Sequence, residues 1–385
     1  MDDVIVVGAG PAGAMAASIL ARAGARVRMF DRARFPRPKL CGDTLNPGAL
    51  HMLATEMPID RVLARSLPLD GMLLSGPGDI QVRGRYDGGL CGRAISRREL
   101  DSLLVAHAVE TGVQFDERTT VAAAITDRDG RVGGVALKGR NGLTTEHRAR
   151  MVLAADGRAS RLARALGLAR QPLRPRRWAI GSYFEGVDDL ITAGEMHVRR
   201  GHYIGVAPMP GGLANVCLVL PGDSPALRER DMARLLTATL TADAGLAPRF
   251  ERARLVEAPQ VLGPMAVDCA RVGVPGLLLA GDAAGFIDPM TGDGLRFAFA
   301  GATLSAATIL DILTGRLRHD AAVSQLARAR RTAFAAKWRF NRSLRALVAS
   351  PSAVGFAATG ARILPAAFEA IIRYAGDCQT VPRVA

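Results

Sequence analysis

Cysteine is scarce in this sequence, and its five copies are scattered. Their odd number does not suit a closed set of disulfides, and none is paired at the short spacing of a metal site. We therefore expect free thiols in a reducing cytoplasm rather than a secreted protein. Histidine also lacks ligand spacing, which predicts no metal centre. The five cysteines are Cys41, Cys91, Cys217, Cys269 and Cys378.

A long hydrophobic run is also missing. A membrane-spanning helix needs about 20 consecutive apolar residues, and no such uninterrupted stretch is present. The apolar residues 4–20 follow two aspartates and are broken by glycine and proline, unlike a signal peptide. We therefore expect a cytoplasmic protein that does not cross a bilayer.

Lysine is nearly absent, so the formal net charge of +14 comes almost wholly from arginine. A positive field attracts nucleotides, acidic substrates, anionic lipid and nucleic acid alike. Because no nucleic-acid motif accompanies the charge, we predict no nucleic-acid partner. The three lysines are Lys39, Lys138 and Lys337.

The N-terminus has the pattern of a dinucleotide half-site. A strand over 4–7, a glycine turn, a helix over 11–23 and a strand over 26–30 follow one another. The glycines allow a pyrophosphate to approach the N–H groups at the helix start, and the acid after the second strand can bind ribose hydroxyls. The cofactor-binding residues predicted here are Gly8, Gly10, Pro11, Ala12, Gly13, Asp31 and Arg32.

The later chain returns to this domain twice, at apolar strands over 151–154 and 276–280. Residues 178–221 are rich in strand pattern with a hairpin at 210–212, and residues 294–375 are mainly helical. The predicted fold is α/β. It has a discontinuous Rossmann-like lobe (1–70, 95–175 and 265–315), a mixed β-sheet substrate lobe (71–94 and 176–264) and a helical C-terminal region (316–385).

Three motifs give the sequence a specific resemblance. They are an arginine segment at 95–101, an Asp-Gly motif at 155–160 and a Gly-Asp motif at 281–286. In this order they resemble the flavoprotein superfamily that contains para-hydroxybenzoate hydroxylase, geranylgeranyl reductases and flavin-dependent halogenases. The resemblance implies one tightly bound FAD, with Arg97 (or Arg98) at its phosphates, Asp156 near the flavin and pyrophosphate, and Asp282 at the ribityl chain.

The segment after the Gly-Asp motif introduces a long helix. The resemblance implies that its N-terminal amides point at the flavin pyrimidine edge, where a partial positive charge favours the anionic reduced flavin by about 1–2 kcal/mol. The cofactor-binding residues implied by these later motifs are Gly157, Gly281, Pro289, Gly292, Gly294 and Leu295.

Within the superfamily, the sequence is most similar to the reductase branch. Aromatic hydroxylases usually have histidine at the position of Gly285, and halogenases carry two tryptophans on the strand over 203–208 together with a catalytic lysine, for which we find no convincing candidate. Geranylgeranyl reductases have a Tyr-x-Trp-x-Phe-Pro signature on that strand. Tyr203 and Pro208 match it, whereas Gly205 and Ala207 do not.

The loop over 38–43 resembles the cysteine-glycine segment that lies beside the flavin in the reductases. Alkene reduction needs a hydride from flavin N5 and a proton from an acid. Cys41 is our candidate acid, and packing under the cofactor is its alternative role. Gly42 joins it as a cofactor contact and Tyr203 is a second catalytic candidate, while Asp43 is expected to cap the following turn.

The function we predict is FAD-dependent reduction of a carbon–carbon double bond in an isoprenoid or other apolar small molecule. The alternative is a monooxygenase or halogenase acting on an aromatic or polyketide, and a third hypothesis is a non-catalytic FAD-containing binding protein. No second dinucleotide fingerprint is visible, so NADPH or NADH would bind transiently, or an electron-donor protein would replace it. The basic helix over 316–345 either packs on its own domain or makes a peripheral membrane contact.

Overall fold

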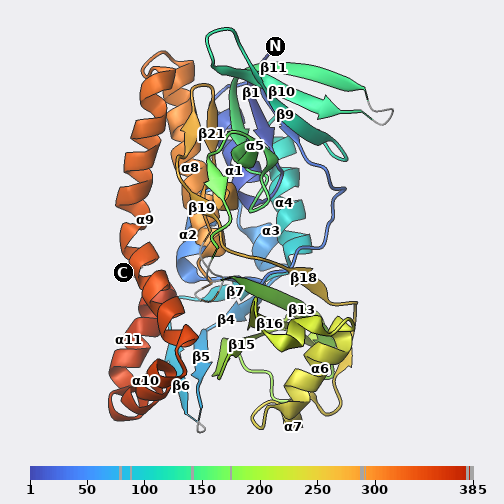
Figure 1. The fold of residues 1–385 in the computed structure, drawn as a ribbon, viewed down its shortest axis with the longest axis vertical. Coiled ribbons are helices and arrows are strands. Elements are labelled where there is room, and N and C mark those ends of the chain that lie inside the picture. Colours follow the sequence, from blue (N-terminus) through green and yellow to red (C-terminus); the bar gives the residue numbers. More distant parts are fainter. Residues whose placement is uncertain are drawn as a thin grey trace.

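The computed structural model describes residues 1–77, 80–86, 89–139, 143–173, 176–286, 290, 292–378 and 381, without the side chains of 348, 349, 351, 358, 361, 362, 365 and 368. Two lobes lie one above the other, and a long helix runs beside both (Figure 1).

The upper lobe is built on a sheet in the order β20-β21-β11-β1-β2-β8, in which β21 to β8 run parallel and the edge strand β20 is antiparallel. Its central strands are almost fully buried, as expected for a parallel sheet that is covered on both faces. Distant parts of the chain thereby meet side by side, as the sequence predicts. The strands are β1 (Asp2–Val7), β2 (Val27–Phe30), β8 (Gln114–Asp116), β11 (Thr144–Ala154), β20 (Gly273–Val274) and β21 (Leu277–Leu279).

One face of this sheet packs against three helices that share its core, namely α1 (Pro11–Arg22), α4 (Arg97–Glu110) and α8 (Gly294–Leu313). The predicted hairpin after α4 is present, because β9 (Thr120–Thr126) pairs antiparallel with β10 (Val132–Lys138). Shorter elements complete the lobe: α2 (Pro47–Glu56), α3 (Asp60–Leu63), α5 (Arg161–Ala165), β12 (Ala169–Arg170), β19 (Asp268–Cys269) and a 3₁₀ turn (Gly281–Ala284).

The lower lobe is a mixed sheet in the order β17-β13-β16-β15-β14-β5-β6, with β18 also paired to β13. The predicted hairpin is formed by β15 and β16 around Pro210–Gly212. A small sheet of β3 (Thr44–Leu45), β7 (Gly92–Ala94) and β4 (Leu67–Leu69) links the lobes. The strands of the large sheet are β5 (Gly71–Ser75), β6 (Gln81–Arg85), β13 (Arg177–Glu185), β14 (Ala193–Arg199), β15 (His202–Met209), β16 (Leu213–Pro221), β17 (Arg254–Leu255) and β18 (Gln260–Leu262).

The outer face of that sheet is covered by α6 (Met232–Ala242) and α7 (Ala247–Phe250). Leu236 and Leu240 of α6 are buried against apolar side chains of β13, β15 and β16. The other face of the sheet is therefore the one turned toward the upper lobe and available to a ligand.

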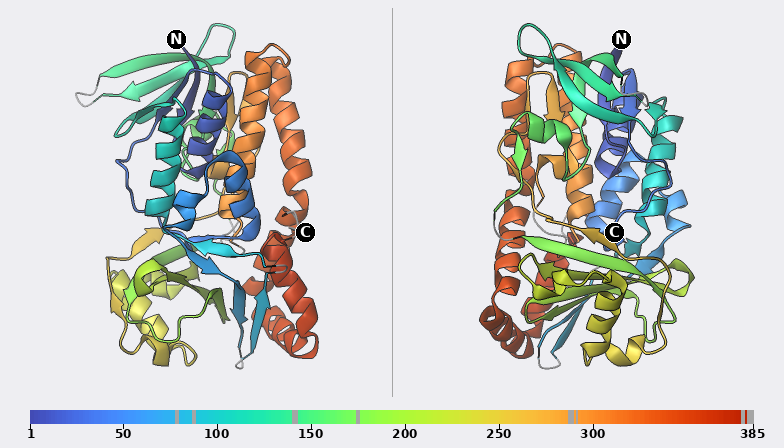
Figure 2. Two further views of the ribbon diagram at one scale, coloured as in Figure 1. Left: turned by 180° about the vertical axis from the view of Figure 1, so that it is seen from behind. Right: turned by 45° about the vertical axis from the view of Figure 1, so that its right-hand side comes forward.

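The C-terminal helices connect the lobes from the side. In Figure 1 and in both panels of Figure 2, α9 (His319–Ala349) stands beside α8 and reaches down to α10 (Pro351–Ile363) and α11 (Pro365–Ala375). Within the described part of the chain, α8 alone is long and apolar enough to cross a membrane, and 61% of its most apolar window is buried inside the protein.

Candidate functional site

A cavity of about 800 Å³ lies between the two lobes. Its upper wall comes from the carboxyl ends of the parallel strands and the starts of α1, α4 and α8, and its lower wall comes from β14, β15 and β16. It collects these residues predicted from the sequence: Gly8, Gly10, Pro11, Ala12, Asp31, Arg32, Cys41, Gly42, Arg97, Asp156, Gly157, Tyr203, Gly281, Asp282, Gly292, Gly294 and Leu295.

Gly13 does not line the cavity but is needed to shape it. A Cβ atom at Gly13 would lie 1.8 Å from the Gly8 carbonyl oxygen, and one at Gly8, where φ is +98°, would lie 2.6 Å from the Ala155 oxygen. Any side chain at either position would push the start of α1 away from the end of β1. The first turn of α1 faces the cavity and has no side-chain cap, which leaves its N–H groups for an anionic ligand.

Asp31 fixes the loop at the end of β2. Its Oδ2 accepts a hydrogen bond of 2.8 Å from the Ala9 N–H, and its Oδ1 accepts one of 2.8 Å from the Ala33 N–H. The carboxylate thus ties the glycine turn to the second strand while it lines the cavity.

The cavity is strongly basic, which suits a pyrophosphate. Arg97 is buried and holds its guanidinium against Asp101, with Nε at 2.7 Å and Nη2 at 2.8 Å from the carboxylate. Arg98, the alternative to Arg97, does not line this cavity and pairs with Glu257 instead. The basic residues that line the cavity are Arg32, Arg37, Lys39, Arg97, Lys138, Arg158 and Arg161.

The carboxylates of Asp156 and Asp282 line the cavity. Asp156 accepts a hydrogen bond from the Arg161 N–H through Oδ2, whereas its buried Oδ1 has no partner among the described residues. Burial raises the pKa of Asp156. Burial also raises the pKa of Asp282, an effect opposed by Lys39, Arg97 and Arg158. An unpartnered buried oxygen indicates a missing polar ligand.

These features fit FAD. The residues that would hold it are the glycine turn and α1 at the pyrophosphate, Asp31 at the ribose, and Asp156 and Asp282 along the middle of the cavity. The start of α8 would follow, because Gly292, Gly294 and Leu295 line the cavity beyond Asp282. Pro289 lies outside the described residues.

The Cys41 loop forms the wall opposite the Gly-Asp motif. Burial raises the pKa of the Cys41 thiol, which keeps it protonated. Tyr203 is buried on β15 and lines the same cavity, as does Cys217 on β16, whose thiol donates to the Cys41 carbonyl oxygen at 3.3 Å. The neighbouring wall is apolar and comprises Leu40, Met196, Val219, Leu262, Met265, Phe286 and Met290.

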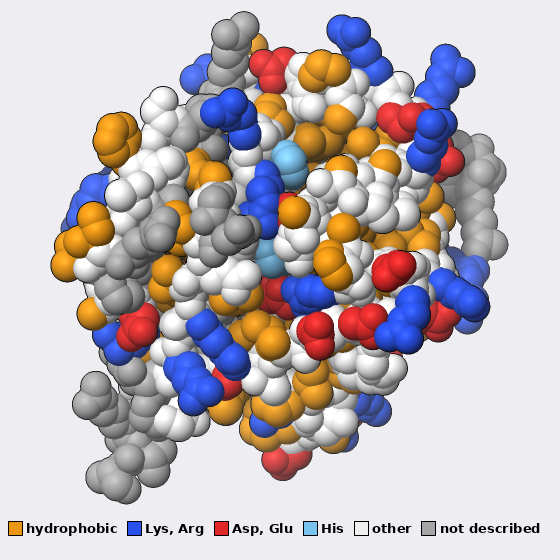
Figure 3. All heavy atoms as spheres, turned by 90° about the horizontal axis from the view of Figure 1, so that it is seen from below, with side chains coloured by type: hydrophobic (Ala, Val, Ile, Leu, Met, Phe, Trp, Pro, Cys, Tyr) orange, Lys and Arg blue, Asp and Glu red, His pale blue; other side chains and the backbone are white. Residues whose placement is uncertain are grey.

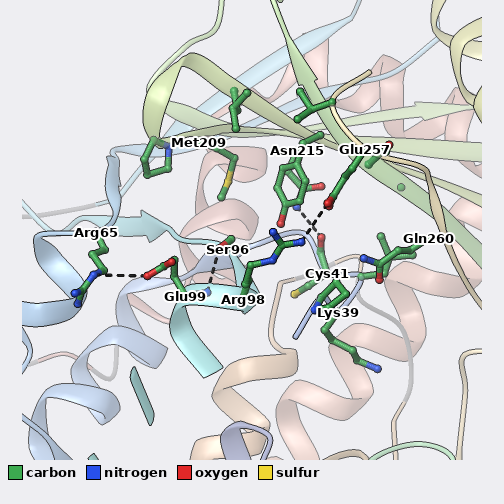
Figure 4. Close-up of a pocket in the computed structure, with 18 residues that line it drawn as sticks. Lys39, Cys41, Arg65, Ser96, Arg98, Glu99, Met209, Asn215, Glu257 and Gln260 are labelled. Atoms are coloured by element: carbon green, nitrogen blue, oxygen red, sulfur yellow. Dashed lines mark hydrogen bonds and ion pairs between the residues drawn. The ribbon is translucent and has the colours of Figure 1, made fainter. Parts of the chain in front are cut away.

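A second cavity of about 290 Å³ lies on the far side of this loop. Figure 4 shows Lys39, Cys41 and Asn215 at one side of it and the Arg98–Glu257 ion pair at another. Lys39, Cys41 and Asn215 line both cavities, so the loop is a thin partition between them.

Asp43 is buried within this partition. Its carboxylate accepts hydrogen bonds from the Tyr183 hydroxyl, from Asn215 Nδ2 at 2.6 Å and from the Arg97 N–H at 3.2 Å. Burial raises its pKa to about 7. The sequence predicts a cap for the following turn, whereas the structure gives the carboxylate long-range partners on β13 and β16.

Sequence reasoning missed Lys39, Arg158, Asn215 and Cys217 as cavity residues. Lys39 stands two residues before Cys41, so its nearness to the site has a local signal. Asn215 and Cys217 alternate on β16 with buried apolar residues, a pattern that shows which face they share but not what the face meets.

Residues 1–339 match the family model described as FAD binding domain. The chain belongs to this FAD-binding family. Its curated relatives include digeranylgeranylglycerophospholipid reductase 2 of Methanopyrus kandleri, which is 33% identical over 76% of this chain and 73% of the relative. Menaquinone reductase of Mycolicibacterium smegmatis is 30% identical over 79% of this chain and 75% of the relative.

Solved structures share the fold. The flavin-dependent brominase Bmp2 superposes with a TM-score of 0.83 at 18% identity, covering 99% of this chain and 96% of its own. A geranylgeranyl bacteriochlorophyll reductase-like protein from Thermoplasma acidophilum gives 0.76 at 23% identity, covering 90% and 87%. The predicted fold, the FAD cofactor and the assignment as an FAD-dependent oxidoreductase are thereby confirmed.

Proposed function

We propose that this oxidoreductase reduces a carbon–carbon double bond of an isoprenoid chain. The observation that carries the proposal is the apolar wall beside Cys41, formed by the buried cluster that includes Tyr203, Val219, Met265 and Met290. An apolar substrate would be held there by burial of its surface. The names of the curated relatives, digeranylgeranylglycerophospholipid reductase and menaquinone reductase, support isoprenoid lipids or quinones as the substrate class.

Bound FAD, once reduced, supplies the hydride. The Cys41 thiol supplies the proton: its S–H bond breaks as the C–H bond at the second alkene carbon forms. The raised pKa keeps this thiol protonated before the step and makes the resulting thiolate a strong base afterwards. Tyr203, on the facing wall, would orient the alkene over the cofactor.

The thiolate needs a proton after each turnover. Asp43, two residues away, has a pKa near 7 and is bonded to the Tyr183 hydroxyl, which lines the second cavity. A proton from water in that cavity would pass to the Tyr183 oxygen as the Tyr183 proton passes to Asp43, and the Asp43 carboxyl would reprotonate Cys41.

The test is a single turnover without oxygen. The FAD-loaded protein is photoreduced and mixed with a geranylgeranylated glycerolipid, with menaquinone, or with a fully saturated lipid as control. We expect flavin reoxidation with the unsaturated compounds only, and a product that keeps two added hydrogen atoms in its isoprenoid chain after any quinol has been reoxidised in air. Unchanged reduced flavin with every unsaturated lipid would contradict the proposal.

The alternative of a monooxygenase or halogenase has one structural point in its favour. Lys39, one of the three lysines, lines the cavity, and burial lowers its pKa. Rapid mixing of the reduced protein with aerated buffer, with aromatic compounds present, separates the two functions. A transient oxygen adduct in the flavin spectrum supports the alternative, and direct return to the oxidised spectrum supports the reductase.

The source of electrons is part of the proposal. NADPH, NADH or a donor protein would reduce the cofactor before the lipid binds. Anaerobic mixing with each nucleotide distinguishes these cases, because bleaching of the flavin identifies a nucleotide donor, whereas no bleaching identifies a protein donor.

We further propose that the C-terminal helices touch an anionic membrane. The apolar face of α9 is buried within the protein and its exposed face carries arginines, so α9 is not itself the apolar contact. Exposed apolar side chains gather instead on α10 and α11, at Phe356, Ile363, Leu364 and Ile371. Figure 3 shows the molecule from below, with hydrophobic side chains lying among basic ones on that face, a mixture typical of interfacial helices.

A further inference from the structure

Arg330 of α9 is a buried cation without a carboxylate partner among the described residues. It is 4% exposed, and its Nη2 donates to the Ala284 carbonyl oxygen at 2.9 Å. Its Nε and Nη1 are buried and have no hydrogen-bond partner within the part of the chain that the structure describes. An unneutralised charge in a protein interior is costly, so such a group is rare unless something compensates it.

Lys337, on the same helix, is a buried cation that nearby carboxylates neutralise. Lys337 is also 4% exposed, and its Nζ lies 3.4 Å from an Asp293 oxygen and 3.5 Å from an Asp377 oxygen. It also donates to the carbonyl oxygens of Tyr374 and Ala375. α9 therefore carries two buried cations toward α8. Lys337 is balanced by carboxylates, and Arg330 has none beside it among the residues that the structure describes.

The protein makes room for Arg330. A Cβ atom at Gly301, in the middle of α8, would lie 3.0 Å from Arg330 Nη1, so a larger residue would displace the guanidinium. A glycine inside a helix costs about 1 kcal/mol relative to alanine. The rings of Phe334 and Trp338 lie 5.1 and 5.9 Å from the guanidinium carbon and stabilise the cation.

Arg330 keeps its charge. Burial lowers its pKa to about 10, which still leaves the guanidinium protonated at neutral pH. The rings offset part of the cost of burial, but they add no negative charge. The positive charge of Arg330 therefore acts electrostatically on the groups around it.

Arg330 lies behind the residues that form one wall of the FAD cavity. Arg330 lines a small space of about 20 Å³ together with Gly281, Asp282 and Gly294, and these three residues also line the FAD cavity from the other side. Asp282 does not cancel the charge, because its electrostatic partners are Lys39, Arg97 and Arg158. One layer of backbone thus separates Arg330 from the cofactor site.

We propose that Arg330 is an electrostatic positioning residue that raises the reduction potential of the bound FAD through the Gly281–Ala284 turn. Two-electron reduction with uptake of one proton leaves the flavin with one more negative charge. A fixed cation nearby stabilises that form over the oxidised one, and it acts together with the positive N-terminus of α8. Arg330 itself touches neither cofactor nor substrate. The inference depends on FAD alone and not on the proposed substrate.

The test compares three variants of the FAD-loaded protein by anaerobic redox titration against reference dyes. Arg330→Gln keeps an N–H donor for the Ala284 oxygen but removes the charge, and Arg330→Lys keeps the charge. Arg331→Gln is the matched control, because Arg331 is the exposed neighbour on the same helix. The ratio of affinities for reduced and oxidised FAD should fall at least tenfold in Arg330→Gln, a drop of about 30 mV in midpoint potential. The two other variants should keep the wild-type potential.

Two results would overturn the inference. One is a wild-type potential in Arg330→Gln. The other is a wild-type potential that depends on halide concentration at constant ionic strength, because a small anion would then neutralise the guanidinium. If Arg330→Gln does not retain FAD, Gly301→Val is used instead, because its added methyl groups would displace the guanidinium without removing it. Its potential should fall relative to Gly355→Val, a helix position with open space around it, and equal potentials would count against the proposal.

Discussion

The side-chain amide of Asn215 donates a hydrogen bond of 2.6 Å to the Asp43 carboxylate. The same nitrogen donates to the Cys41 carbonyl oxygen at 2.8 Å. Asn215 lies on β16 of the lower lobe, while Asp43 and Cys41 belong to the loop after β2. One amide therefore holds the cysteine loop against the sheet, and the site depends on the contact between the lobes.

Replacing Asp43 by asparagine should change how stability depends on pH. The folded pKa is about 7 and the unfolded value is 3.8, so folding favours the protonated carboxyl. The resulting stabilisation is complete below about pH 4 and is lost as the pH rises through 7, by roughly 2–4 kcal/mol. Urea unfolding between pH 5 and 8 should show a falling free energy for the wild type and a flatter curve for Asp43→Asn. Parallel curves would mean that Asp43 does not titrate in this range.

Replacing Gly13 by alanine should abolish FAD retention. The new Cβ would lie 1.8 Å from the Gly8 carbonyl oxygen and would force α1 away from β1. The ratio of flavin to protein absorbance after gel filtration measures retention. Gly355→Ala, in a helix with nothing within 4 Å of the new Cβ, is the control and should retain FAD fully. Full retention in Gly13→Ala would show that the turn can shift without loss of the cofactor.

Replacing Cys41 by alanine should slow alkene reduction about a hundredfold or more, the usual contribution of a positioned acid. Flavin reduction by dithionite should proceed at the wild-type rate, because that step needs no proton from the thiol. Cys91→Ala is the control, since Cys91 is exposed and lies outside both cavities. An unchanged rate of alkene reduction in Cys41→Ala would assign Cys41 to packing alone.

Replacing Phe356 and Ile371 together by glutamate should weaken binding to anionic vesicles at least tenfold. These side chains are 80% and 40% exposed on α10 and α11, and burying a carboxylate in lipid is unfavourable. Flotation with phosphatidylglycerol vesicles measures the binding. The control combines Leu173→Glu with Val109→Glu, which adds the same two negative charges to the upper lobe, because Leu173 is 82% exposed in a loop that follows β12 and Val109 is 47% exposed on α4. Equal losses in both variants would point to net charge rather than to a specific face.

Local patterns in the sequence carry much of this fold. The strand, glycine turn and helix at the N-terminus, the hairpin at 210–212 and the long C-terminal helices all have signals within a short window of sequence. Helix α6 was not predicted. Its apolar face is recognisable only once the sheet that it covers is known, since Leu236 and Leu240 pack on β13, β15 and β16.

The site was predictable only where a motif carried it. The glycine turn, Asp31, the Asp-Gly motif and the Gly-Asp motif meet at one cavity, because they follow β1, β2, β11 and β21 of the same sheet. No sequence motif predicts the partition that the Cys41 loop forms between the two cavities. Tyr183 and Asn215 are register partners on the paired strands β13 and β16, whereas Asp43 comes from the loop after β2 and joins them only through side-chain hydrogen bonds. Arg330 was likewise predicted as one of many arginines on a basic helix, and its burial depends on the glycine opposite it in α8.

The discontinuous sheet also sets the order in which the protein can be completed during synthesis. The strands β1, β11 and β21 stand side by side, yet the third begins 275 residues after the first. The ribosome therefore releases the glycine turn long before the Gly-Asp motif and α8 exist to close the cavity. Early in translation the FAD site lacks the Gly-Asp motif and α8. The complete site can therefore bind FAD only after nearly the whole chain has emerged from the ribosome.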